Sequence, residues 1–155
     1  MLDVKIINAT MDALKVAFVT AAKTDFKVQK PLMVKEVERI YDVITVIGFN
    51  GAIDGNLVYA VKREGAITIV NNMMSGMLEI NSLDEMALSA ISELGNMVSG
   101  SIAMSLEKIG YSINITPPSV ITGKDLQVLS EGTILKFPGI IHDETEMGVF
   151  LAMKT

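Results

Sequence analysis

The first hydrophobic pattern along the chain has the period of an α-helix. Apolar side chains recur near helical spacing at Ile6, Ile7, Leu14, Phe18 and Ala21. Because one face of a helix repeats every three to four residues, this spacing predicts a helix from about Lys5 to Ala22. Pro31 follows, and we expect extended structure from that residue onward.

Two runs rich in β-branched residues predict a hairpin in the next part of the chain. The runs are Asp42 to Phe49 and Leu57 to Lys62, and the turn-forming pairs Asn50-Gly51 and Asp54-Gly55 lie between them. Residues 65–77 are ambiguous, since their first half favours a strand by composition whereas their Asn- and Met-rich second half is typical of a helix end. We interpret this segment as a short helix.

The longest predicted helix begins at Ser82 and ends at Gly110. Ser82-x-x-Glu85 has the form of a capping box, in which a hydroxyl and a carboxylate satisfy free backbone N–H groups. Asp84 and Glu85 also place negative charge at the positive end of the helix dipole. Gly110 is a typical stop, because glycine readily adopts the left-handed conformation that closes a helix.

Extended runs follow this helix. Pro117-Pro118 breaks the chain after the run 111–116, and two more runs cover Thr133 to Phe137 and Met147 to Met153. A helix followed by strands therefore occurs twice along the chain.

A short internal similarity agrees with this repeated order. Leu-Val-Tyr-Ala-Val-Lys at 57–62 resembles Val-Phe-Leu-Ala-Met-Lys at 149–154, which suggests an internal duplication. No low-complexity stretch or interdomain linker interrupts the chain. We predict one α/β domain over residues 1–155, with long helices packed on an antiparallel sheet in two pseudo-repeated halves of helix plus strands.

Composition narrows the class of protein and of site. Half of the 155 residues are apolar, but charged residues interrupt every apolar run before the 18 or so residues that a membrane span needs. The net charge of -5, without a basic cluster, argues against nucleic acid and anionic membranes as partners. The absence of cysteine excludes disulfides, thiolate zinc sites and cysteine nucleophiles. The N-terminal residues lack the pattern of a signal peptide, so we expect a cytoplasmic protein.

The helix predicted over 82–110 has an outward polar face. At about 100° per residue, its apolar side chains gather on one side. The opposite side carries Ser89, Glu93, Asn96 and Gly100, with a flank formed by Met86, Met97 and Met104. Gly95 and Gly100 each cost about 1 kcal/mol relative to alanine inside a helix. Small residues beside an acid and an amide favour a shallow surface for another protein. The other interpretation is a solvated helix face, since Glu-x-x-Asn is a common pattern.

The sequence of this helix resembles that of a known family. Residues 93–100, Glu-Leu-Gly-Asn-Met-Val-Ser-Gly, are similar to the signature helix of the CheX and CheC chemotaxis phosphatases, in which Glu-x-x-Asn is the active motif. The likeness extends to the helix exit Gly110-Tyr111, to the segment 115–123 with its Pro-Pro pair, and to the hairpin glycines Gly51 and Gly55. It covers nearly the whole chain.

The number of motifs indicates one branch of this family. CheC-like members have two Glu-x-x-Asn motifs, and CheX-like members have one. In the first predicted helix the residue three before Asn8 is Lys5, not Glu, so a second motif is missing. The resemblance therefore implies a CheX-like fold. It also implies a homodimer, for which the sheet edges that a monomer would expose are a second argument.

The resemblance further implies an enzyme of two-component signalling, a hydrolase that removes the aspartyl phosphate from a CheY-like response regulator. Asn96 would orient the attacking water, and Glu93 would pair with the active-site lysine of the regulator. Mg²⁺ would be held by the regulator, and the chain would have no cofactor of its own. Partner contacts are expected at Ser89, Met97 and Gly100. The alternative is a non-catalytic module that binds a response regulator or another signalling protein through the same face.

Other chemistries have little support in the sequence. His142 is the only histidine, and we interpret the polar stretch 142–146 around it as a solvated turn. No metal site is expected there, because the partners of a single histidine would have to come from elsewhere in the chain. Patterns of a serine nucleophile elbow, a dinucleotide-binding loop and a P-loop are missing.

Overall fold

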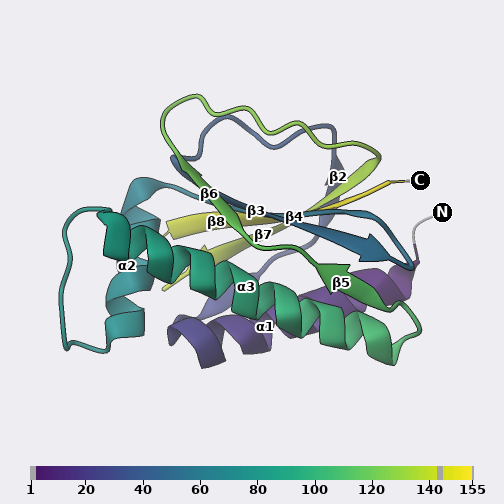
Figure 1. The fold of residues 1–155 in the computed structure, drawn as a ribbon, viewed down its shortest axis with the longest axis horizontal. Helices are drawn as coiled ribbons and strands as arrows, with labels where there is room; N and C mark the ends of the chain where they lie inside the picture. Colours follow the sequence, from purple (N-terminus) through teal and green to yellow (C-terminus); the bar gives the residue numbers. More distant parts are fainter. Residues whose placement is uncertain (1–2, 143–144, 155) are drawn as a thin grey trace.

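The computed structural model describes residues 3–142 and 145–154, which form helices on one side and a sheet on the other (Figure 1). The helices of this part are α1 (Val4–Ala22), α2 (Arg63–Met74) and α3 (Glu85–Lys108). Its strands are β1 (Phe26–Val28), β2 (Leu32–Val34), β3 (Val43–Gly51), β4 (Gly55–Val61), β5 (Ile113–Ile115), β6 (Ser119–Thr122), β7 (Thr133–Ile141) and β8 (Thr145–Met153). The predicted α/β class is confirmed.

The strands pair antiparallel in the order β1-β7-β8-β4-β3-β5, while β2 also pairs with β7 and β6 also pairs with β3. Exchanging β1 to β4 with β5 to β8 reproduces this order in reverse. The sheet therefore has a pseudo-twofold arrangement about the β4–β8 pair, in which Val58 lies opposite Phe150. This topology agrees with the two pseudo-repeated halves predicted from the sequence.

The first two helices lie close to where the sequence places them. α1 begins at Val4, one residue before the prediction, because the Asp3 carboxylate accepts a hydrogen bond from the Lys5 N–H at 2.9 Å and caps the helix. The segment interpreted as a short helix is α2, although it starts earlier than predicted and ends at Met74. It ends there because Ser75 has a left-handed φ of 53°.

α3 starts later than the capping box predicts. Asp84, not Ser82, is the N-cap, and its Oδ1 accepts a hydrogen bond from the Ala87 N–H at 2.9 Å. A carboxylate here combines the cap with favourable charge at the helix dipole, whereas a serine offers the hydrogen bond alone. The predicted stop is confirmed, since Gly110 has a φ of 99° immediately after the helix.

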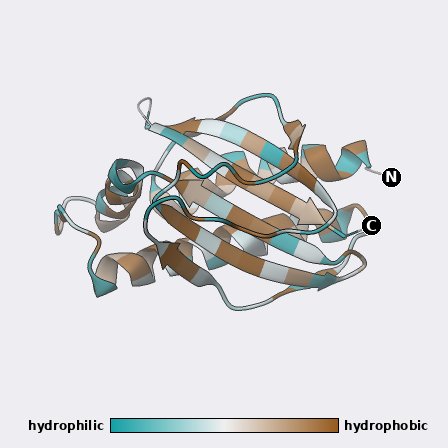
Figure 2. Ribbon diagram, turned by 90° about the horizontal axis from the view of Figure 1, so that it is seen from above, coloured by the Kyte–Doolittle hydropathy of each residue, from teal (hydrophilic) through white to brown (hydrophobic). Residues whose placement is uncertain are grey.

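The sheet is covered on both faces. The main core lies between sheet and helices and includes the inner face of α3, formed by Ala87, Ile91, Leu94, Val98, Ile102 and Leu106. Two long connections, residues 35–42 and 123–132, cross the other face, and Figure 2 shows that they are largely hydrophilic. Their buried residues Val37 and Tyr41 belong to a second core with Phe150. The outer side of α3 is left facing solvent.

Two smaller features complete the description. His142 is exposed at the end of β7, whereas Asp143 and Glu144 of the predicted turn lie outside the described residues. Among the helices of the described ranges, none has the length and apolar character that crossing a membrane requires.

Candidate functional site

The acid and amide singled out in the sequence lie on the outer side of α3. Glu93 is exposed and Asn96 is half-buried, one helical turn apart. In the described part of the chain, neither side chain has a hydrogen-bond or ion-pair partner. An unpaired carboxylate and an unpaired amide on one rigid helix are therefore free to engage another molecule.

A groove runs beside these two side chains. One wall consists of Ser92, Glu93 and Asn96, and the facing wall consists of Ile115, Thr116, Pro117 and Pro118, at the end of β5. The groove has a volume of about 420 Å³ and is open to solvent. None of the described residues that line it is cationic, so the negative charge of Glu93 has no compensation within the groove and would attract a cation from a partner.

The second wall is held firmly against the sheet. The Thr116 hydroxyl oxygen accepts a hydrogen bond from the Gly48 N–H at 2.9 Å, and the Thr116 N–H binds the Gly48 carbonyl oxygen at 2.8 Å. Both contacts join the end of β5 to β3. The two prolines that follow have fixed φ angles. Anything that reaches Asn96 from this side therefore meets a stiff apolar wall.

The three predicted partner-contact residues lie along the solvent side of the same helix. Ser89 is exposed, and Met97 is 43% exposed. Gly100 is half-buried, and a Cβ at this residue would meet no described atom within 4 Å apart from the adjoining residues and backbone of its own helix. The space over Gly100 is therefore open, and a partner surface can approach the helix backbone there. Further along the helix, Met104 adds an exposed apolar side chain.

The inner side of α3 contains contacts that the sequence analysis missed. Gly95 lies so close to β3 that a Cβ on it would be 2.9 Å from Cγ2 of Thr45. One turn further along, the hydroxyl groups of Ser99 and Tyr59 share a hydrogen bond of 2.7 Å, and both residues are buried. A polar residue on the apolar side of a helix was the available signal for Ser99.

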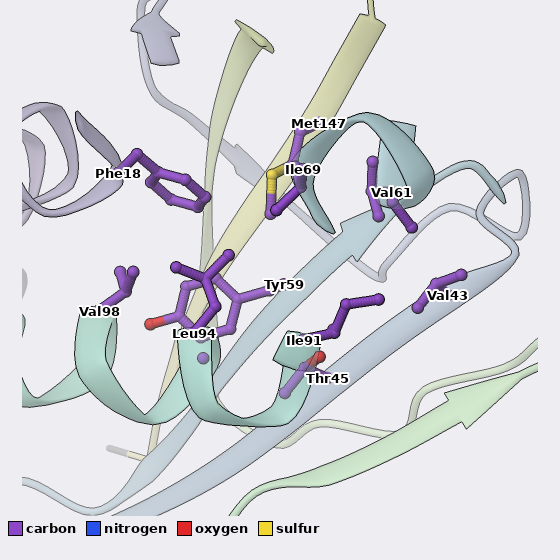
Figure 3. Close-up of a pocket in the computed structure, with 12 residues that line it drawn as sticks. Phe18, Val43, Thr45, Tyr59, Val61, Ile69, Ile91, Leu94, Val98 and Met147 are labelled. Atoms are coloured by element: carbon purple, nitrogen blue, oxygen red, sulfur yellow. The ribbon is translucent and has the colours of Figure 1, made fainter. Parts of the chain in front are cut away.

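A small apolar cavity of about 20 Å³ lies beside these contacts, under α3. Figure 3 shows Leu94 and Val98 of α3 facing Tyr59 and Phe18 across it. Its size and its apolar lining do not suit a charged substrate. The open groove at Glu93 and Asn96 is the candidate functional site.

Both the sequence and the fold of this chain are similar to those of known proteins. The sequence model of the family described as chemotaxis phosphatase CheX matches residues 43–138. A Thermotoga maritima protein named CheY-P phosphatase CheX is 41% identical over 154 residues, which covers 99% of each chain. Among solved structures, a CheC-like superfamily protein from a Shewanella species superposes with a TM-score of 0.87 at 25% identity, covering 99% of this chain and 100% of that one. The CheX-CheY-BeF3-Mg²⁺ complex from Borrelia burgdorferi gives 0.80 at 20% identity, covering 96% and 97%.

Proposed function

The chain belongs to the chemotaxis phosphatase CheX family, and we propose that it hydrolyses the aspartyl phosphate of a CheY-like response regulator at the groove beside Glu93 and Asn96. The observation that carries the assignment of the site is the unpaired acid and amide, one turn apart on the outer side of a rigid helix. The phosphatase name of the Thermotoga maritima relative, at 41% identity over almost the whole chain, supports the reaction.

Asn96 is proposed to orient the attacking water. A carboxamide has both a donor and an acceptor, so it holds a water molecule in line with the phosphorus atom without acting as a base. The helix and the groove wall limit where this side chain points, and preorganisation of this kind lowers the barrier. The regulator would contribute its lysine and Mg²⁺, which stabilise the charge that develops on the phosphoryl oxygens.

Glu93 is proposed to pair with the active-site lysine of the regulator. Its carboxylate is exposed, and none of the described residues that line the groove is a cation that would compete for it. Such a pair fixes the orientation of the docked regulator, so that its phosphoryl group faces Asn96. Docking and chemistry are thus assigned to different side chains of one helix.

The surface around this pair is proposed to receive the rest of the regulator. Ser89, Met97 and Gly100 would contact it along α3, and the open space over Gly100 allows a close approach. The wall at Pro117 and Pro118 would limit docking on the other side of Asn96. Because its substrate is a signalling protein of the cytoplasm, we place the action of this chain there.

The proposal is tested by separating docking from hydrolysis. Asn96→Ala should bind a phosphorylated CheY-like regulator nearly as well as the parent, but removing a preorganised group should slow phosphate release by about 10² to 10³. Glu93→Ala should instead weaken the complex, since truncating one partner of a buried interfacial charge pair costs about 2 to 5 kcal/mol, and Glu93→Lys should weaken it further.

Control variants should lie away from the groove. Glu131→Ala and Gln127→Ala remove an exposed acid and an exposed amide from residues 123–132, on the other face of the sheet, and should leave both binding and hydrolysis unchanged. If Asn96→Ala releases phosphate as fast as the parent, the water-orienting role is wrong. A non-catalytic module that binds the regulator then becomes the better description of this groove.

A further inference from the structure

Two contacts on the inner side of α3 lie directly behind the proposed site. Gly95 immediately precedes Asn96, and its missing side chain lets the helix approach Thr45 of β3 closely. Ser99 follows Asn96 by three residues, and its hydroxyl group shares the 2.7 Å hydrogen bond with that of Tyr59 on β4. The residue that is proposed to hold the water is thus bracketed by two residues that contact the sheet.

The hydrogen bond differs in kind from the packing around it. Ser99 is 0% exposed and Tyr59 is 5% exposed, so each hydroxyl relies on the other after losing water. Burial also raises the pKa of Tyr59, so the phenol stays protonated at physiological pH and keeps its donor. Apolar contacts beside the cavity are not directional. The hydrogen bond is directional, and it constrains how far α3 turns about its axis.

We propose that the Tyr59–Ser99 hydrogen bond, together with the Gly95–Thr45 contact, positions Asn96 by fixing the rotation of α3 on the sheet. This inference rests on the proposed function. A side chain reaches about 5 to 6 Å from the helix axis, so a rotation of about 10° moves its end by about 1 Å. Displacements of that size reduce rates by up to about 10²-fold in well-oriented reactions. Tyr59 is therefore a positioning residue, because it acts through α3 and does not touch the substrate.

The test uses Tyr59→Phe, which removes one hydroxyl from the chain of 155 residues. With a phosphorylated CheY-like regulator as substrate, kcat should fall by about tenfold while KM stays within about twofold of the parent value. Tyr41→Phe is the matched control, since Tyr41 is also buried but lies in the second core on the other face of the sheet. It should change neither constant. Circular dichroism at the assay temperature checks that each variant is folded.

A second comparison separates positioning from general loosening of the fold. In an Asn96→Ala background, Tyr59→Phe should lower kcat by less than about twofold, because the side chain that it positions is gone. Ser99→Ala removes the other hydroxyl of this hydrogen bond. It should likewise lower kcat in the parent background but hardly change it in the Asn96→Ala background. An equal loss of kcat in both backgrounds would overturn the inference.

The outcomes also distinguish this inference from the proposed function. If Asn96→Ala is slow but Tyr59→Phe keeps the parent kcat, the positioning role is wrong and the function stands. A higher KM with unchanged kcat in Tyr59→Phe would likewise contradict positioning, since it would mean that the hydroxyl affects docking. If Asn96→Ala is itself as fast as the parent, the proposed mechanism is wrong. A positioning role for Tyr59 then has no basis, because the position of Asn96 does not affect the rate.

Discussion

Gly95 and Gly100, the two glycines inside α3, test how closely this helix packs against the sheet. Each lowers helix stability by about 0.5 to 1 kcal/mol relative to alanine, by backbone entropy alone. Their surroundings differ, however. A Cβ at Gly100 would meet no described atom within 4 Å beyond the adjoining residues and backbone of its own helix, whereas a Cβ at Gly95 would lie 2.9 Å from Cγ2 of Thr45. Gly100→Ala should therefore stabilise the protein, and Gly95→Ala should not.

The magnitude at Gly95 follows from two opposing terms. The gain in helix propensity is about 1 kcal/mol at most. Overpacking a filled interior costs about 1 to 3 kcal/mol, and Thr45 is only 2% exposed, with a stiff β-branched side chain that cannot easily turn away. The net effect is a loss of stability of up to about 2 kcal/mol. For a chain of this length, each kcal/mol corresponds to about 2 to 4 °C in Tm.

Urea unfolding and thermal melts measure the stability of both variants. A compensating substitution tests whether crowding against Thr45 causes the loss of stability. Thr45→Ser removes the Cγ2 methyl group that the new Cβ would meet, so Gly95→Ala with Thr45→Ser should be more stable than Gly95→Ala alone. Phosphatase activity should recover with stability. If Gly95→Ala is as stable as Gly100→Ala, the close approach of α3 to β3 does not constrain the helix, and that contact can no longer be part of the positioning device.

Two further predictions concern partners. Gly100→Leu should preserve or raise folding stability but weaken regulator binding, because the new side chain fills the open space beside Asn96; unchanged turnover would show that the regulator does not approach there. The chain should form a homodimer, since Leu32, Met33 and Ile121 expose apolar side chains on edge strands β2 and β6; light scattering at micromolar concentration that shows only a 16.7 kDa species would contradict this.

The sequence predicts the elements whose hydrophobic pattern is local. It does not predict the elements that form only by pairing with strands distant in the sequence. The periodicity of α1 and the hairpin of β3 and β4 is encoded within each segment, so the sequence predicts both to within a few residues. Strands β1 and β6 have three and four residues, too few to establish an alternation of apolar and polar side chains, and they exist because they pair with β7 and β3. A strand of this length has no signal of its own before its partner is placed.

The candidate site also contains residues whose proximity follows from local pattern and residues that only the fold brings together. A helical wheel is enough to place Glu93 and Asn96 together, because both lie on one helix. The groove wall at Pro117 is brought to them only by the pairing of β5 with β3, and sequence spacing does not reveal it. The contacts of Ser99 with Tyr59 likewise join residues 40 positions apart. The sequence therefore predicts which polar side chains share one helix, but it does not predict which residues of other elements pack against that helix.

The pseudo-twofold fold raises the question of why only the half with α3 carries the proposed site. In α1, Asn8 is exposed and would offer an amide, but the residue one turn before it is Lys5, which is also exposed. A regulator that presents its active-site lysine to this helix would meet a like charge, which opposes docking instead of fixing it. An amide without the acid would lack the ion pair that is proposed to orient the docked regulator, and orientation of the reactants lowers the barrier to reaction. Under the proposed mechanism the pair on α3 therefore acts as a unit, and each chain of the proposed dimer would dephosphorylate one regulator at a time.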